Sequence, residues 1–110
     1  RMRFIDSHCH LADAAFDADR DAVIQRAADA GAAAIVCIGA SLADAQRARD
    51  LAAEYPLLQW TAGIHPQDAS SFDAALHLPA LAALLDTGAV VVGECGLDYH
   101  YENASRDRQR

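Results

Sequence analysis

Residues 4–10 read FIDSHCH, a short run with β-forming residues that ends in two histidines one residue apart. Side chains alternate between the two faces of a strand, so His8 and His10 are expected on one face and Cys9 on the other. Both imidazoles could then reach one metal ion. The alternative is a polar strand end with two solvated histidines, because short motifs give many false matches.

The composition is that of one folded domain. The chain has 110 residues, of which 53% are hydrophobic and 23% charged, so it can bury a core. Nine basic and sixteen acidic side chains give a formal net charge of -7. This charge argues against a passive electrostatic binder of nucleic acid, but it does not exclude an enzyme whose bound cations supply positive charge at the site.

The cysteines and the apolar runs are typical of a protein in the reducing cytoplasm. Three cysteines without the spacing of a disulfide framework suggest reduced thiols, and no stretch resembles a signal peptide or a membrane span. We therefore expect a cytoplasmic protein with no membrane partner. Cys9 and Cys95 are expected to be small core residues.

Strand-like and helix-like segments alternate along the chain. Apolar β-type runs cover residues 4–6, 33–38, 58–64 and 90–94, and helical periodicity covers residues 42–54 and 80–86 after a first helix that begins at Asp17 or Asp19. Ser105 is placed to cap the start of a further helix. The alternation predicts parallel strands and right-handed crossovers. We expect an α/β fold of the (β/α)₈ TIM-barrel type, of which this chain holds about the first four βα units.

Candidate site residues follow the predicted strands. His8 and His10 end the first strand, His65 follows the third and Glu94 ends the fourth. The carboxyl ends of the strands carry the active site in barrels of this class. A carboxylate after an apolar run would be costly to bury without a partner, and a cation is the natural partner. The sequence therefore predicts a metal site, with imidazole favouring zinc and carboxylate favouring magnesium or manganese.

Two residues near these strand ends have competing interpretations. His65 precedes Pro66, so it could cap a turn instead of lining the site. Asp98 could orient the site, and capping of its own loop is an equal alternative.

Three motifs taken together resemble the TatD family of metal-dependent deoxyribonucleases. They are IDSHCHL at residues 5–11, GIHP at 63–66 and GECGLDY at 93–99, and the final RDRQR at 106–110 is similar to the helix start that follows in that family. The resemblance covers essentially the whole chain, in order.

The resemblance implies an amidohydrolase-type barrel with one or two divalent ions, Mg, Mn or Zn. In such a barrel, His8 and His10 would bind one metal ion, and Glu94 would be a ligand that bridges the two ions. His65 would lie near the substrate phosphate. The implied reaction is hydrolysis of DNA phosphodiester bonds, with a metal-bound water as nucleophile and cleavage from the 3′ end.

The family pattern also includes two later histidines and an aspartate, the expected base, which are not among residues 1–110. We therefore expect residues 1–110 to be the N-terminal half of a single TatD-like hydrolase barrel, truncated and with little or no activity alone. Its open sheet edges predict self-association. The alternatives are a related amidohydrolase or phosphoesterase with a small substrate, a non-catalytic metal-binding half-barrel that self-associates, and an α/β domain without a site.

Overall fold

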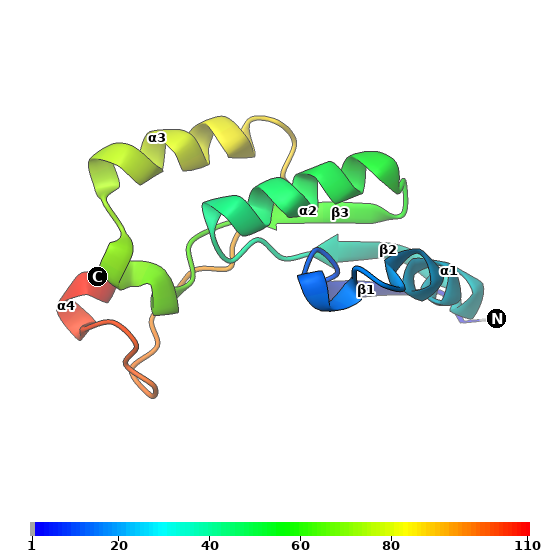
Figure 1. Ribbon diagram of the computed structural model, residues 1–110, viewed down its shortest axis with the longest axis horizontal. Coiled ribbons are helices and arrows are strands. Elements are labelled where there is room, and N and C mark those ends of the chain that lie inside the picture. The colour runs from blue at the N-terminus through cyan, green and yellow to red at the C-terminus, as the bar shows by residue number, and fades with distance from the viewer. Residues whose placement is uncertain (1) are drawn as a thin grey trace.

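Four parallel strands form one sheet in the order β1-β2-β3-β4 (Figure 1). The computed structural model describes residues 2–110, so Arg1, which the predicted domain includes, lies outside the described part. The strands are β1 Phe4–Cys9, β2 Ala32–Cys37, β3 Leu58–Ala62 and β4 Val91–Val92. Because the sheet order is the chain order, each segment between consecutive strands connects two neighbours in the sheet. The predicted alternation of strands and helices and the parallel pairing are confirmed.

The helices begin and end at local sequence signals. They are α1 Arg20–Ala30, α2 Leu42–Glu54, α3 Ala74–Leu85 and α4 Arg106–Gln109, with short 3₁₀ helices at η1 Ala14–Phe16 and η2 Pro66–Ser71. The Ser41 hydroxyl accepts from the Asp44 N–H and caps α2, and Gly31 ends α1 at a φ of 109°, which favours glycine. Among the described residues, no helix has the length and apolarity needed to cross a membrane.

The third helix is longer than predicted. The expected span, 80–86, assumed that Pro79 occupies the first turn, but α3 begins at Ala74 and contains Pro79. The Asp73 carboxylate starts the helix by accepting from the N–H groups of Ala75 and Leu76. Pro79 removes one N–H donor at an exposed position, where water can hydrate the carbonyl left free.

Two strands are shorter than predicted at their carboxyl ends. β3 ends at Ala62 rather than at 64, and β4 is reduced to Val91–Val92. Beyond these points the backbone bonds to the loop after β2: the His65 N–H donates to the Ala40 carbonyl at 2.8 Å, and the Glu94 N–H donates to the Gly39 carbonyl at 3.0 Å. The chain therefore leaves the sheet at the edge where the predicted site residues lie.

The core fills the space between the sheet and the helices. Ile35 and Cys37 of β2 and Trp60 of β3 pack there with small residues of α2, Ala45 and Ala48, which are fully buried and allow α2 to lie along β3 (Figure 1). On the other face of the sheet, residues of all four strands and of the segments next to them line an open cavity of about 300 Å³: Ser7, His8, Val36, Ile38, Thr61, Val90, Val91, Gly93 and Glu94.

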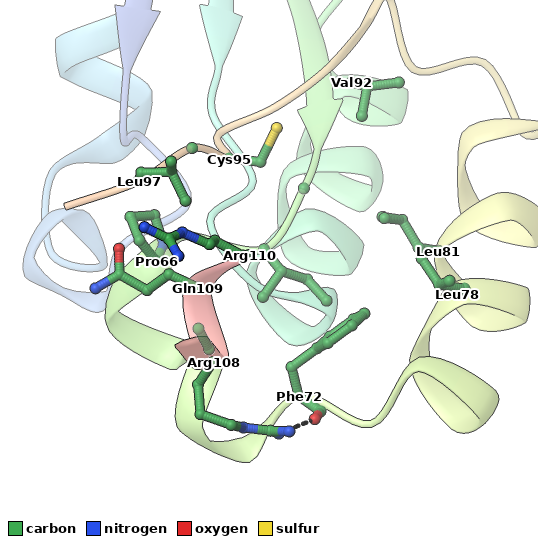
Figure 2. Close-up of a pocket in the computed structure, with 14 residues that line it drawn as sticks. Pro66, Phe72, Leu78, Leu81, Val92, Cys95, Leu97, Arg108, Gln109 and Arg110 are labelled. Carbon is green, nitrogen blue, oxygen red and sulfur yellow. Dashed lines mark hydrogen bonds between the residues drawn. The ribbon is translucent and has the colours of Figure 1, made fainter. Parts of the chain in front are cut away.

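A second pocket, of about 370 Å³, lies between η2, α3, β4 and α4 (Figure 2). Phe72, Leu81 and Val92 line it, together with Cys95. The prediction that Cys95 is a core residue is wrong, since its side chain is exposed. The strand ends at Val92, so the alternation on which that prediction depended does not extend to Cys95. Cys9 is half-buried and packs against the core, as predicted.

Candidate metal centre

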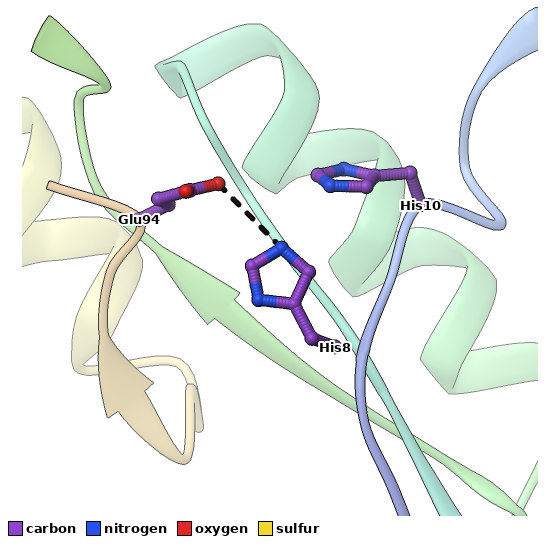
Figure 3. Close-up of side chains that lie close together, drawn as sticks. All are labelled: His8, His10 and Glu94. Carbon is purple, nitrogen blue, oxygen red and sulfur yellow. Dashed lines mark ion pairs between the residues drawn. The ribbon is translucent and has the colours of Figure 1, made fainter.

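Three predicted ligands come together at the carboxyl edge of the sheet. His8 and His10 come from the end of β1, and Glu94 from the segment that follows β4. One available ligand atom of each residue lies within 4.8 Å of those of the other two. In Figure 3 the Glu94 carboxylate faces the His8 ring, and His10 lies beside His8. The structure therefore places residues from opposite ends of the chain in one cluster that could hold a metal ion.

The spacing of this cluster is close to that of a coordination sphere. His8 Nε2 lies 3.7 Å from Glu94 Oε2, too far for a hydrogen bond, and the rings of His8 and His10 meet edge to face with centroids 5.2 Å apart. Two ligands of one ion, each bound at about 2.1 Å, are at most about 4.2 Å apart. The His8–Glu94 pair already meets this limit. Small side-chain rotations would bring in His10, whose residue is exposed.

His65 caps a turn and also lies beside the cluster, while its role near the substrate phosphate stays a prediction. Its Nδ1 accepts from the Gln67 N–H at 3.1 Å and caps η2, whereas its Nε2 lies 3.8 Å from Glu94 Oε1. Because Nδ1 is an acceptor, the neutral ring carries its proton on Nε2, the nitrogen directed toward the cluster. Each Glu94 oxygen thus faces a different imidazole, that of His8 or that of His65.

Asp98 caps the loop that follows Glu94. Its Oδ1 accepts from the backbone N–H groups of His100 and Tyr101, at 3.0 and 3.1 Å. The Gln109 amide pairs with the Asp98 backbone in both directions, accepting from its N–H at 2.7 Å and donating to its carbonyl at 2.9 Å. The structure shows the loop-capping role of Asp98, and the orienting role stays a prediction. Sequence reasoning missed Gln109, since a glutamine in a short polar helix carries no distinguishing signal.

The two thiols beneath the cluster form a pair. Cys9 Sγ lies 3.8 Å from Cys37 Sγ on the neighbouring strand. The hydrogen bond from Cys37 lowers the pKa of Cys9, and the same bond together with burial raises the pKa of Cys37. Cys9 thus faces the core while the adjacent histidines face the cluster, as the strand alternation predicts.

Gly63 approaches the backbone beside Glu94 closely. A Cβ on Gly63 would lie 2.6 Å from the Gly93 carbonyl carbon and 2.8 Å from the Glu94 nitrogen. Both are backbone atoms that cannot rotate away. We therefore expect Gly63→Ala to lower the free energy of unfolding by about 1–3 kcal/mol and to weaken metal binding by displacing Glu94.

Urea unfolding and a metal titration measure the two effects of Gly63→Ala. Gly93→Ala is the matched control, because its Cβ would meet no atom within 4 Å. Equal stability and equal metal affinity of Gly63→Ala and the unsubstituted chain would contradict the prediction.

Comparison with known proteins assigns the chain to a family. The family model described as TatD related DNase matches residues 5–110. Two proteins named 3'-5' ssDNA/RNA exonuclease TatD, from Shigella flexneri and Escherichia coli, are 35% and 34% identical to this chain over 104 residues. Each match covers 94% of this chain and 40% of the relative. The chain therefore spans about two fifths of the length of these curated relatives.

Solved structures show the same fold. A TatD homologue from Escherichia coli superposes with a TM-score of 0.85 at 34% identity, over 97% of this chain and 42% of that one. A TatD family hydrolase from Entamoeba histolytica superposes with a TM-score of 0.85 at 26% identity, over 98% of this chain and 42% of that one. The predicted (β/α)₈ type, with four βα units in this chain, is confirmed.

Proposed function

The chain belongs to the TatD-related DNase family, whose model matches residues 5–110. We propose that the chain carries the metal-binding part of a hydrolase that cleaves DNA phosphodiester bonds. One observation carries the proposal: His8, His10 and Glu94 gather at the carboxyl edge of a parallel sheet, the edge that bears the active site in barrels. The relatives named as 3'-5' exonucleases of single-stranded DNA and RNA support cleavage from the 3′ end.

We further propose that residues 1–110 form the N-terminal half of one barrel domain. The 40% coverage of the relatives supports this arrangement, as do the outer edges of β1 and β4, which pair with no other strand among residues 2–110. Apolar side chains near these edges are exposed, Ile5 at 63% and Val91 at 57%. Further strands of the barrel would cover them. Self-association of half-barrels is the competing arrangement, and the mass of the protein in solution separates the two.

In this proposal His8, His10 and Glu94 hold one divalent ion of the Mg, Mn or Zn class. The second carboxylate oxygen, Oε1, faces His65 rather than His8, and it would be the atom available to a second ion if one were bound. A bound cation supplies a water of lowered pKa and neutralises charge that develops on the phosphoryl oxygens.

His65 and Asp98 have supporting roles. The Nε2–H of His65 is the donor proposed to bind a phosphate oxygen of the substrate, and the Gln67 N–H fixes its ring by bonding Nδ1. Asp98 is proposed to orient the site by holding the loop that follows Glu94. We place the reaction in the cytoplasm, where the three free thiols, Cys9, Cys37 and Cys95, would stay reduced.

A single-stranded DNA oligonucleotide labelled at its 5′ end tests the proposed function. With Mg²⁺ or Mn²⁺ and the full coding product that contains these residues, the label should move into steadily shorter fragments as the 3′ end recedes. Residues 1–110 alone should give little or no product, because the aspartate expected as base is not among them.

The competing functions give other results in the same assay. Intact DNA beside hydrolysis of a cyclic amide or a small phosphoester would support a small-substrate hydrolase. A stable metal-loaded oligomer that hydrolyses none of these substrates would support the non-catalytic half-barrel.

A further inference from the structure

Thr61 places a buried hydroxyl near the carboxyl end of β3, with 3% of the residue exposed. Its Oγ1 accepts from the Gly39 N–H at 3.1 Å and donates to the Gly93 carbonyl at 2.7 Å. Gly39 belongs to the loop after β2, and Gly93 directly precedes Glu94. One hydroxyl therefore connects the ends of three neighbouring strands.

These contacts are part of a closed ring of hydrogen bonds. Thr61 Oγ1 donates to the Gly93 carbonyl, the Glu94 N–H donates to the Gly39 carbonyl at 3.0 Å, and the Gly39 N–H returns to Thr61 Oγ1. The peptide between Gly93 and Glu94 is thus held at both of its polar groups, the carbonyl oxygen and the N–H. The groups in the ring are strong donors and acceptors that would be costly to leave unpaired in a buried place.

The Glu94 carboxylate has no comparable restraint of its own. Its contacts with His8 and His65 are 3.7 and 3.8 Å long, and the hydrogen bonds recorded for residues 2–110 include none to its oxygens. The position and orientation of the Glu94 backbone therefore determine where its carboxylate points. Gly63, which directly follows β3, packs against the same peptide and leaves it little room to move.

We propose that Thr61 is a positioning residue for the metal centre: through the ring with Gly39 and Gly93 it fixes the Glu94 backbone, and so aims the carboxylate at His8 and His10. Thr61 does not contact the ion in this scheme and acts only through Glu94. The proposal rests on the proposed metal site and deepens it.

Three substitutions separate positioning from a general contribution to stability. Thr61→Val keeps the branched shape and removes the hydroxyl, Thr61→Ser keeps the hydroxyl and removes the methyl group, and Ile24→Val trims a buried side chain of α1 outside the ring. A merely structural role predicts that metal affinity follows stability in all three. Positioning predicts that metal affinity follows the hydroxyl.

Zn²⁺ titration by equilibrium dialysis, with the visible absorption of bound Co²⁺ as a second readout of the ligand geometry, provides the test. We expect Thr61→Val to weaken Zn²⁺ binding about 10- to 100-fold, the range for groups that orient metal ligands, and to alter the Co²⁺ spectrum. Thr61→Ser and Ile24→Val should bind Zn²⁺ as the unsubstituted chain does.

Unchanged Zn²⁺ affinity in a folded Thr61→Val overturns the positioning role. If Thr61→Val does not fold, Thr61→Ser decides, because a loss of more than about tenfold in that variant would show that the hydroxyl is not the operative group. His8→Ala tests the site itself. Wild-type Zn²⁺ binding in His8→Ala overturns the metal centre together with the role of Thr61, whereas binding lost in His8→Ala and kept in Thr61→Val overturns the role of Thr61 alone.

Discussion

Replacement of Glu94 by glutamine should weaken the binding of a divalent cation by more than about 100-fold. Loss of a residue that only orients a metal ligand lowers metal affinity about 10- to 100-fold, so loss of a direct ligand should lower it more. Glu94 is also the only member of the cluster with His8 and His10 that carries a negative charge. Glutamine keeps the size of the side chain and removes that charge. Isothermal titration with Zn²⁺ or Mn²⁺ measures the change.

Glu54→Gln is the matched control, because Glu54 is an exposed carboxylate at the far end of α2 and outside the cluster. It should bind metal as the unsubstituted chain does. A bound ion also stabilises the fold by mass action, by about 2.7 kcal/mol at a concentration 100 times Kd. The metal-dependent rise in Tm should therefore disappear in Glu94→Gln and persist in Glu54→Gln. Equal metal affinity in the two variants would remove Glu94 from the ligand set.

Trp60→Ala should cost about 3–5 kcal/mol of unfolding free energy, the usual loss for a large aromatic residue removed from a core. Trp60 is 6% exposed and packs in the hydrophobic core between β3 and the helices. Domains are stable by only about 5–15 kcal/mol, so this single change should remove a large share of the total. Because Trp60 is the only tryptophan, urea unfolding should be followed by circular dichroism rather than by fluorescence.

Leu76→Ala provides the comparison for Trp60→Ala. Leu76 lies on α3 and is 66% exposed, so its removal should change stability by about 0.5 kcal/mol or less. Similar losses in Trp60→Ala and Leu76→Ala would show that the apolar layer between sheet and helices is not the main core.

The fold could be predicted where local signals mark both ends of an element. Ser41 and Pro56 bracket α2, and Gly31 ends α1 in a conformation that few other residues adopt. Prediction failed where two signals compete. Pro79 is typical of a first turn, yet Asp73 six residues earlier starts α3, and sequence alone does not show which of the two signals dominates.

The proximity of the three proposed ligands could be predicted because alternating strands and helices place the carboxyl end of every strand at one edge of the sheet. His8, His10 and Glu94 required no further information. The support of this cluster could not be predicted, since the ring through Thr61 joins β3 to the loops after β2 and β4, which meet only in the folded chain. The dual use of the His65 ring has the same origin, because Nδ1 meets the Gln67 N–H within η2 whereas Nε2 faces Glu94, which arrives from the segment after β4.

The match between sheet order and chain order has a consequence for synthesis. Each strand pairs with the one made just before it, so the sheet can grow as the polypeptide leaves the ribosome. His8 and His10 emerge early, and at 5–20 residues per second Glu94 follows roughly 5–15 s later. During that interval the nascent chain offers two imidazoles without the carboxylate. If these three residues bind the ion as proposed, its capture is a late step that follows the arrival of the fourth strand.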